Sequence, residues 1–371
     1  MRAILSIGVF IFCQVAFSSP LTFKGIIKDI ETDEPIPFAH VVLDEVITLS
    51  NLDGQFVISA GSEVKILQVS VMGYDLATKE IESTSDFLVI YLTPSTTQLE
   101  EVTITSGDVL MRDVFNRFHL NYEVSNQHMV GYYKESLADF DSMYYLAEGI
   151  IDIYVPSNVQ YNETLVSPIK TRKKVFKPID EDVMILKGNA SDMAKSSIWR
   201  KDSFLSYKNR KNYDFFYSGA STIGNKEVFI VEFEPKNSKG NTSGKIYIEE
   251  ETLAVVKLEY HPTIKGNTMW KEVKWVEEFY EKNGIYELFR VSYSGKWEEW
   301  NKDYSYDALL VVNETVSSVD APVDTAFLGE NDSFFNEAAE DFTEEFWAGY
   351  NYIKLDVEAT HQIQKQGVAI Y

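Results

Sequence analysis

The chain has 371 residues, of which 57 are acidic and 34 are Lys or Arg, and its formal net charge is −23 at pH 7. A surface this acidic repels phosphate backbones and anionic headgroups, which argues against a nucleic-acid partner. The single cysteine excludes an internal disulfide, so stability must come from packed cores, and the length allows two domains.

The first 18 residues have the three parts of a secretory signal. Arg2 supplies a basic start, Ala3 to Phe12 form an apolar run, and Ala16-Phe17-Ser18 is a small-residue cleavage pattern. We therefore expect residues 1–18 to be a signal peptide cleaved near Ser18. Cys13 lies inside it without the small preceding residue of a lipid-modified cysteine, so lipoprotein anchoring is the less favoured alternative. No later stretch is apolar over the about 20 residues that a membrane-spanning helix needs.

Residues 21–105 have the pattern of short strands separated by turns, without a helical period. The strand candidates are rich in Val, Ile, Leu, Phe and Thr, as strands usually are. They read LTFKGIIKDI, FAHVVLD, QFVISA, KILQVSVM, FLVIYLTP and LEEVTIT. Short strands at regular spacing predict a small antiparallel β-sandwich.

The stretch Asn51-Leu52-Asp53-Gly54 is the most informative turn of this region. Gly54 tolerates a positive φ, and Asp53 can bond its own neighbouring backbone, so the stretch predicts a hairpin bend. A calcium loop would need alternating oxygen ligands that end in a glutamate, whereas Leu52 and Phe56 interrupt the spacing. We interpret the stretch as a structural turn.

The same region resembles a known module. Gly25-Ile26-Ile27-Lys28-Asp29, Pro37-Phe38-Ala39-His40-Val41, Ser50 to Phe56 and Gly73-Tyr74, in this order, are similar to the carboxypeptidase regulatory-like domain. That domain is a transthyretin-like β-sandwich found in cell-envelope proteins of Bacteroidota. The resemblance implies no catalytic residue, because a peptidase domain would have to lie elsewhere in the chain.

A second domain is expected over residues 106–371. Leu110, Val114 and Phe118 recur at four-residue spacing, which predicts an amphipathic helix over 107–121, capped by Ser106 or Asp108. Long strands joined by turns, among them Asn283-Gly284, predict one large curved antiparallel sheet over about 129–315. We expect Pro168 to Arg210 to leave the sheet as a long excursion.

The tail over about 334–366 is predicted to be helical, with Phe342, Phe346, Trp347 and Tyr350 packed on the sheet. Several stretches resemble uncharacterised secreted proteins of Bacteroidota in which the same module precedes a β-rich envelope domain. They are Asn121-Tyr122, GYYKES at 131–136, LAEGIIDIY at 146–154 and FWAGYN at 346–351. The stretch GKIYIEEETLAVVKLEY is also similar to a strand pair of periplasmic lipoprotein-carrier-like half-barrels.

The expected fold class is therefore mainly β with minor α. A seven-stranded-type, transthyretin-like sandwich is followed by a large curved antiparallel sheet or half-barrel with flanking helices.

No arrangement of residues predicts a catalytic, cofactor-binding or metal site. The five histidines have no paired spacing of a zinc site. GNTSGKI, Gly240 to Ile246, has too few residues for a phosphate loop and is expected to be a turn. Runs such as Glu277-Glu278 cannot converge on a sugar because neighbours on a strand face opposite sides. We interpret them as solvated, and we expect the protein not to be an enzyme.

Aromatic side chains on successive strands are the most suggestive feature. The candidate ligand or interaction residues are Trp270, Trp275, Tyr280, Tyr286, Phe289, Tyr293, Trp297 and Trp300. Strand parity places Val273, Trp275 and Phe279 on one face and Trp270, Val276 and Tyr280 on the other. One face must be core. The second is covered either by the C-terminal helices or by a ligand.

Three functions remain open from the sequence. The first is a secreted, non-catalytic protein of the periplasm or outer membrane that acts in binding or assembly with an envelope partner. The second is a periplasmic carrier of a hydrophobic, lipid-like or glycan ligand. The third is a hydrolase whose site is not recognisable in the sequence.

Overall fold

The computed structural model describes residues 21–60, 66–81, 87–95, 106–139, 142–157, 164–178, 189–198, 200–266, 268–299, 301–321, 327–328, 332–339, 347 and 350–365. The expected signal peptide lies outside these residues. None of the helices in the described part of the chain is long and apolar enough to cross a bilayer.

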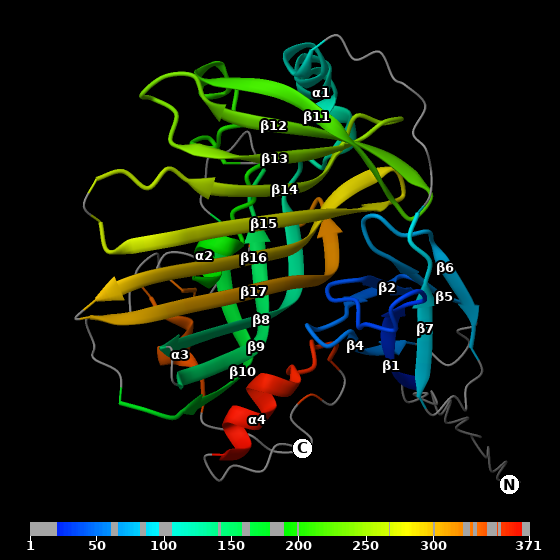
Figure 1. Ribbon diagram of the computed structural model, residues 1–371, viewed down its shortest axis with the longest axis vertical. Coiled ribbons are helices and arrows are strands. Elements are labelled where there is room, and N and C mark those ends of the chain that lie inside the picture. The colour runs from blue at the N-terminus through cyan, green and yellow to red at the C-terminus, as the bar shows by residue number, and fades with distance from the viewer. Residues whose placement is uncertain are drawn as a thin grey trace, which may run out of the picture.

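The described residues are mostly strand, and the first part of the chain is a sandwich of two small sheets (Figure 1). One sheet has the order β4-β1-β7 and the other β3-β2-β5-β6. The strands are β1 (Leu21–Asp29), β2 (His40–Leu43), β3 (Val46–Leu49), β4 (Gln55–Ala60), β5 (Ile66–Ser70), β6 (Ala77–Glu80) and β7 (Leu88–Leu92). Their inward residues, among them Phe23, Ile27 and Phe56, form one buried core. The expected sandwich is confirmed, although β1 and β7 pair in parallel.

The turn at Asn51 to Gly54 joins the two sheets rather than two arms of a hairpin, because β3 and β4 belong to different sheets. Gly54 has a φ of +71°, as its turn assignment requires. The Asn51 side-chain oxygen accepts hydrogen bonds from Asp53 N and Gln55 N at 3.1 and 2.8 Å. The turn is therefore structural, but the expected hairpin is wrong.

Gly54→Val is expected to lower the free energy of unfolding by at least about 1 kcal/mol, with or without calcium. A Cβ at this position would lie 2.5 Å from Ile27 O and would adopt a left-handed backbone. Gly266→Val is the matched control, since Gly266 has a φ of +75° with nothing within 4 Å. Urea unfolding of the full chain measures both, and a Gly54→Val chain as stable as the parent would contradict the turn assignment.

Helix α1 (Gly107–Asn121) begins after Ser106, whose hydroxyl accepts a hydrogen bond from Val109 N at 3.2 Å. It leads into a ten-stranded antiparallel sheet that does not close into a barrel, with the order β10-β9-β8-β17-β16-β15-β14-β13-β12-β11. The strands are β8 (Gln127–Asp139), β9 (Met143–Val155), β10 (Leu165–Val175), β11 (Tyr213–Ile223), β12 (Lys226–Pro235), β13 (Thr242–Glu249), β14 (Val255–Pro262), β15 (Trp270–Lys282), β16 (Ile285–Glu299) and β17 (Lys302–Ser317). Asn283 and Gly284 both have positive φ, as expected of a tight hairpin turn.

The expected excursion from Pro168 to Arg210 is partly wrong, because residues up to Val175 form strand β10. Pro168 is tolerated because β10 is an edge strand, and its register with β9 shifts between Pro168 and Lys170. The C-terminal tail is also less helical than expected. It contains the short α3 (Phe334–Glu337) and α4 (Val357–Lys365), and residues 350–356 are not helical.

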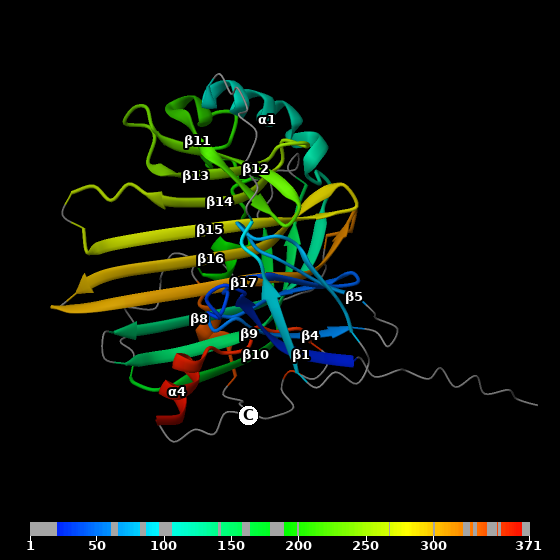
Figure 2. The same cartoon turned by 45° about the vertical axis from the view of Figure 1, so that its right-hand side comes forward.

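The two faces of the large sheet have different covers (Figures 1 and 2). The face on which α1, α2 (Ala190–Met193) and α3 lie, here called the concave face, carries the largest buried cluster. The N-terminal sandwich packs on the opposite, outer face, where its Ile47 and Leu49 join Phe289 and Val311 in a second cluster. Neither cover could be read from local patterns, because each comes from a distant part of the chain.

The C-terminal tail joins the sandwich to the outer face. Trp347 and Ile353 belong to the outer-face cluster. Asp53 of the sandwich accepts a hydrogen bond from Val357 N, the first residue of α4, at 2.6 Å. The Asn51 side-chain amide donates to Leu355 O at 3.3 Å. The tail therefore connects the turn of the sandwich with the large sheet, and these contacts are here called the C-terminal clasp.

Candidate functional site: the concave face of the large sheet

The concave face gathers five of the eight aromatic residues that the sequence singled out. Trp270, Trp275, Tyr286, Tyr293 and Trp297 all belong to or pack against its buried cluster. The ring centroids of Trp275 and Tyr293 lie 4.8 Å apart, and those of Trp270 and Trp297 lie 5.2 Å apart. Trp297 and Tyr293 are buried, whereas Trp270 and Trp275 keep partial exposure.

Two of the eight residues lie on the outer face of the sheet, and one is outside the described residues. Tyr280 and Phe289 face the sandwich, with ring centroids 6.4 and 4.7 Å from that of His40. Trp300 lies outside the described residues. The predicted aromatic set is therefore divided between the two faces rather than gathered in one site.

A β-bulge explains why the parity of Trp270 was predicted wrongly. Trp270 pairs with Trp297, but Glu272 already pairs with Lys296, so Lys271 is an extra residue on β15. The extra residue turns Trp270 to the same face as Trp275. At a second bulge, Glu278 pairs with Arg290 and Phe279 pairs with Leu288, so Phe289 is an extra residue on β16.

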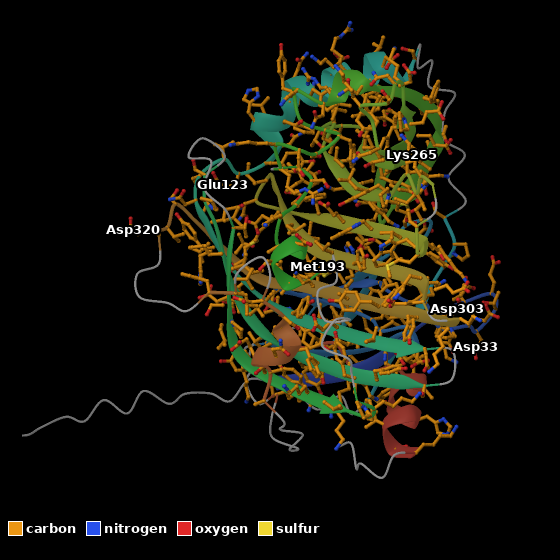
Figure 3. All side chains as sticks on the ribbon, turned by 90° about the vertical axis from the view of Figure 1, so that its left-hand side faces the viewer. Asp33, Glu123, Met193, Lys265, Asp303 and Asp320 are labelled. Carbon is orange, nitrogen blue, oxygen red and sulfur yellow. The ribbon has the colours of Figure 1, made fainter. Side chains whose placement is uncertain are left out.

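The connection between β10 and β11 forms part of the cover on the concave face. These strands are the two edges of the sheet, so the chain between them must cross one face. Residues 189–198 and 200–212, here called the cover segment, include α2 and are otherwise turns with one short 3-10 helix. In Figure 3, α2 with Met193 lies inside the curve of the sheet. Phe204 stacks on Phe233 of β12 at 4.3 Å.

Glu277 of β15 anchors the cover segment. Its carboxylate accepts hydrogen bonds from the hydroxyls of Ser196 and Ser197 at 2.8 and 2.5 Å, and from Ser197 N at 2.9 Å. Tyr260 OH donates to it at 2.8 Å from the neighbouring strand. The side chain is buried, so its interpretation as a solvated residue is wrong. The sequence carried no sign of this site, since Ser196 and Ser197 lie about 80 residues away from Glu277.

Glu135 of β8 is a second buried carboxyl on the concave face, and it holds α3. It accepts hydrogen bonds from the hydroxyls of Tyr133, Tyr306 and Tyr145 at 2.6, 2.9 and 3.4 Å, and from Phe335 N at 3.1 Å. Burial raises the pKa of Glu135, although these hydrogen bonds oppose the shift. The cover segment and α3 are thus each tied to the sheet by one carboxyl as well as by apolar contacts.

The outer face has its own buried charges. Glu278 lies beside Glu277 but points to the sandwich, where His40 Nε2 is 3.2 Å from its carboxylate. Arg290 and Lys257 approach the same carboxylate at 3.4 and 3.7 Å. The opposite directions of Glu277 and Glu278 follow from strand parity, as expected. Their burial was not expected.

Metal ligation receives no support from the residues that the structure describes. Among them, no group of three or more His, Cys, Asp or Glu side chains is placed to hold a metal ion. The buried carboxyls of the concave face bond to tyrosine, serine and backbone donors instead. The remaining side chains of the buried cluster on this face are apolar or aromatic.

Several solved structures match part of this chain at low TM-scores. A DUF1329 family protein from Desulfovibrio piger is 12% identical, with a TM-score of 0.27 over 58% of this chain and 95% of that chain. A LolA superfamily protein from Nitrosomonas europaea is 10% identical, with a TM-score of 0.25 over the same shares. A putative membrane-associated protein of unknown function from Bacteroides fragilis is 8% identical, with a TM-score of 0.18 over 80% of this chain and 99% of that chain.

Such low TM-scores carry no argument about function. No curated protein matches the sequence. Residues 23–104 match the family model of the CarboxypepD_reg-like domain, which agrees with the resemblance found in the sequence and identifies the N-terminal sandwich as a domain of this kind.

Proposed function

We propose that the protein is a non-catalytic binding protein of the cell envelope whose concave face takes an apolar ligand when the cover segment moves. The observation that carries the proposal is the nature of this cover. An aromatic face spanning many strands is closed by a connection made mostly of turns, with one four-residue helix. The backbone hydrogen bonds within this layer are short-range, such as those from Ser203 N to Arg200 O and from Ser206 N to Ser203 O, and do not extend the ladder of the sheet.

The polar attachment of the cover supports the same proposal. Ser196 and Ser197 donate to Glu277, so part of the attachment consists of a few bonds that can break together. The apolar surface beneath it would then be free for an acyl chain or a similar group. Burial of such a ligand contributes about 25 cal/mol per Å2, from which the cost of ordering must be subtracted.

The envelope location and the absence of catalysis are parts of the proposal that rest on the sequence. The signal pattern of residues 1–18 supports export to the periplasm or to the outer membrane. No nucleophile and base at a recognisable spacing were found. The proposed partner is either an envelope protein or the apolar ligand itself. Native mass spectrometry of protein purified gently from its own envelope would detect a bound lipid.

The double variant Ser196→Ala/Ser197→Ala is expected to increase uptake of the neutral apolar dye N-phenyl-1-naphthylamine while the chain stays folded. It removes two hydroxyl donors from the cover and leaves the sheet unchanged, and each hydrogen bond to a charged group is worth about 1.5–3 kcal/mol. Dye fluorescence is titrated at a temperature where circular dichroism shows a native fold.

Ser206→Ala is the matched control, since the Ser206 hydroxyl is buried in the same segment and has no hydrogen-bond partner among the residues that the structure describes. It is expected to bind the dye as the parent does. If the double variant is folded and takes up no more dye than Ser206→Ala, the proposal of a movable cover is wrong. The concave face is then permanent core.

A further inference from the structure

A cavity of about 220 Å3 lies between the sandwich and the large sheet, on the outer face. Its walls come from β2 and β5 of the sandwich and from the turn between β11 and β12, and its floor from β14, β15 and β16. It opens on the side of the sandwich, although Phe279 and Tyr286 of its floor also belong to the buried cluster of the concave face. Its volume is below the 300–1,000 Å3 of most drug-sized sites, so it suits one ring-sized unit.

The charged groups at this cavity are already paired inside the protein. The Lys226 ammonium lies 3.1 Å from the carboxylate of Glu249 and 3.4 Å from that of Glu281. His40 Nε2 lies 3.2 Å from Glu278. An ionic ligand would have to compete with these pairs, so the cavity favours a neutral occupant.

The neutral polar groups of the lining are, by contrast, uncommitted. The side chains of Gln68, Ser70 and Asn225 make no hydrogen bond to any residue that the structure describes, and neither does the hydroxyl of Tyr280. Amides and hydroxyls both donate and accept. They can therefore bond to the hydroxyl groups of a ligand in either direction.

The rest of the lining is aliphatic or aromatic. Val42, Leu76 and Ile223 provide apolar walls, and Tyr280 and Phe279 contribute rings. Neutral amides and hydroxyls combined with an aromatic ring suit a sugar, which has hydroxyls at its edge and C–H groups on its ring faces. A purely apolar ligand would leave the polar groups unpaired, at a cost.

The two walls are held in place before any ligand binds. Gly73 N of the sandwich donates to Thr222 O of β11 at 2.8 Å, and Met72 forms a β-bridge with Ile223. A Cβ added at Gly224 in the turn would lie 3.6 Å from the Cβ atoms of Ser70 and Leu76, so the turn lies close to the sandwich. Preorganisation of this kind lowers the cost of binding. The site exists only where the sandwich and the large sheet meet.

We propose that this inter-module cavity binds one neutral pyranose unit, such as the terminal residue of a glycan. Gln68 and Ser70 bond to it from the sandwich, Asn225 bonds to it from the β11–β12 turn, and Tyr280 contacts its ring. The test is saturation-transfer NMR on the full chain with the methyl glycosides of glucose, galactose, mannose and N-acetylglucosamine. Methyl glucuronide is the charged comparator.

At least one neutral glycoside is expected to receive saturation and to bind more tightly than the glucuronide. Gln68→Ala and Asn225→Ala are each expected to weaken its affinity about fivefold, the value of one net hydrogen bond. Both side chains are exposed, so the fold should be unchanged. Asn116→Ala, at an exposed position of α1, is the control and should leave binding as it is. The proposal is overturned if no neutral glycoside binds, if the glucuronide binds more tightly, or if both variants bind as the parent does.

Discussion

Arg172→Met is expected to lower the free energy of unfolding by about 3–5 kcal/mol, because it leaves a buried carboxylate without its cation. Arg172 Nε and Nη2 lie 2.8 and 2.5 Å from Glu148 Oε1, and the Glu148 side chain is 0% exposed. Tyr132 donates to the same carboxylate. The guanidinium also lies over the ring of Trp347, 4.7 Å from its centroid. Removal of the guanidinium would therefore also weaken the packing of Trp347 in the C-terminal tail.

Chemical unfolding of the full chain measures this loss, and a second variant identifies its cause. Arg172→Met/Glu148→Gln removes the unpaired charge and is expected to recover part of the stability. Arg112→Met, at a helix position where the arginine side chain is 67% exposed, should change stability by less than about 1 kcal/mol. A loss at Arg172 no larger than at Arg112 would show that the buried pair does not stabilise this face.

Glu278→Gln is expected to destabilise the chain by about 3–5 kcal/mol at neutral pH and to remove part of its acid sensitivity. Burial alone would raise the pKa of Glu278, but Arg290, His40 and Lys257 outweigh it and hold the pKa well below the usual range. A carboxyl with a lowered folded-state pKa contributes stability above its unfolded pKa of about 4.3. This contribution disappears as the pH falls through the folded-state value.

Thermal unfolding between pH 7 and pH 3 checks the sign of this effect. The parent is expected to lose stability below about pH 5, and Glu278→Gln to lose less over the same range. Glu298→Gln is the matched control, because its carboxylate forms an exposed pair with Lys271 at 2.8 Å. Equal acid sensitivity in the parent and in Glu278→Gln would contradict a charged Glu278 at the contact with the sandwich.

The elements that the sequence predicted well are those whose signals are local. Helix α1 has its apolar period and the cap Ser106 within its own residues. The Asn283-Gly284 turn carries its positive φ preference in the two residues themselves. Alternation along β16 likewise brings Tyr293 and Trp297 to one face.

The features that the sequence did not reveal depend on distant partners or on single extra residues. Strand β10 is rich in basic and polar residues, and one of them, Arg172, is buried against Glu148 rather than exposed to solvent. In the sequence Glu277 resembles a surface residue, because its partners Ser196 and Ser197 belong to the distant cover segment. The bulge at Lys271 shifts parity by one residue, and no local pattern marks it.

The clasp between Asp53 and Val357 also bears on the order of folding. This hydrogen bond joins residues 304 positions apart, so it closes almost the whole chain into a loop. Contacts of such high sequence separation form late, since the entropy of the intervening chain must be lost first. We therefore expect the sandwich and the large sheet to fold as separate units, and the contacts of the tail with the sandwich to form only after helix α4 has been synthesised and has docked.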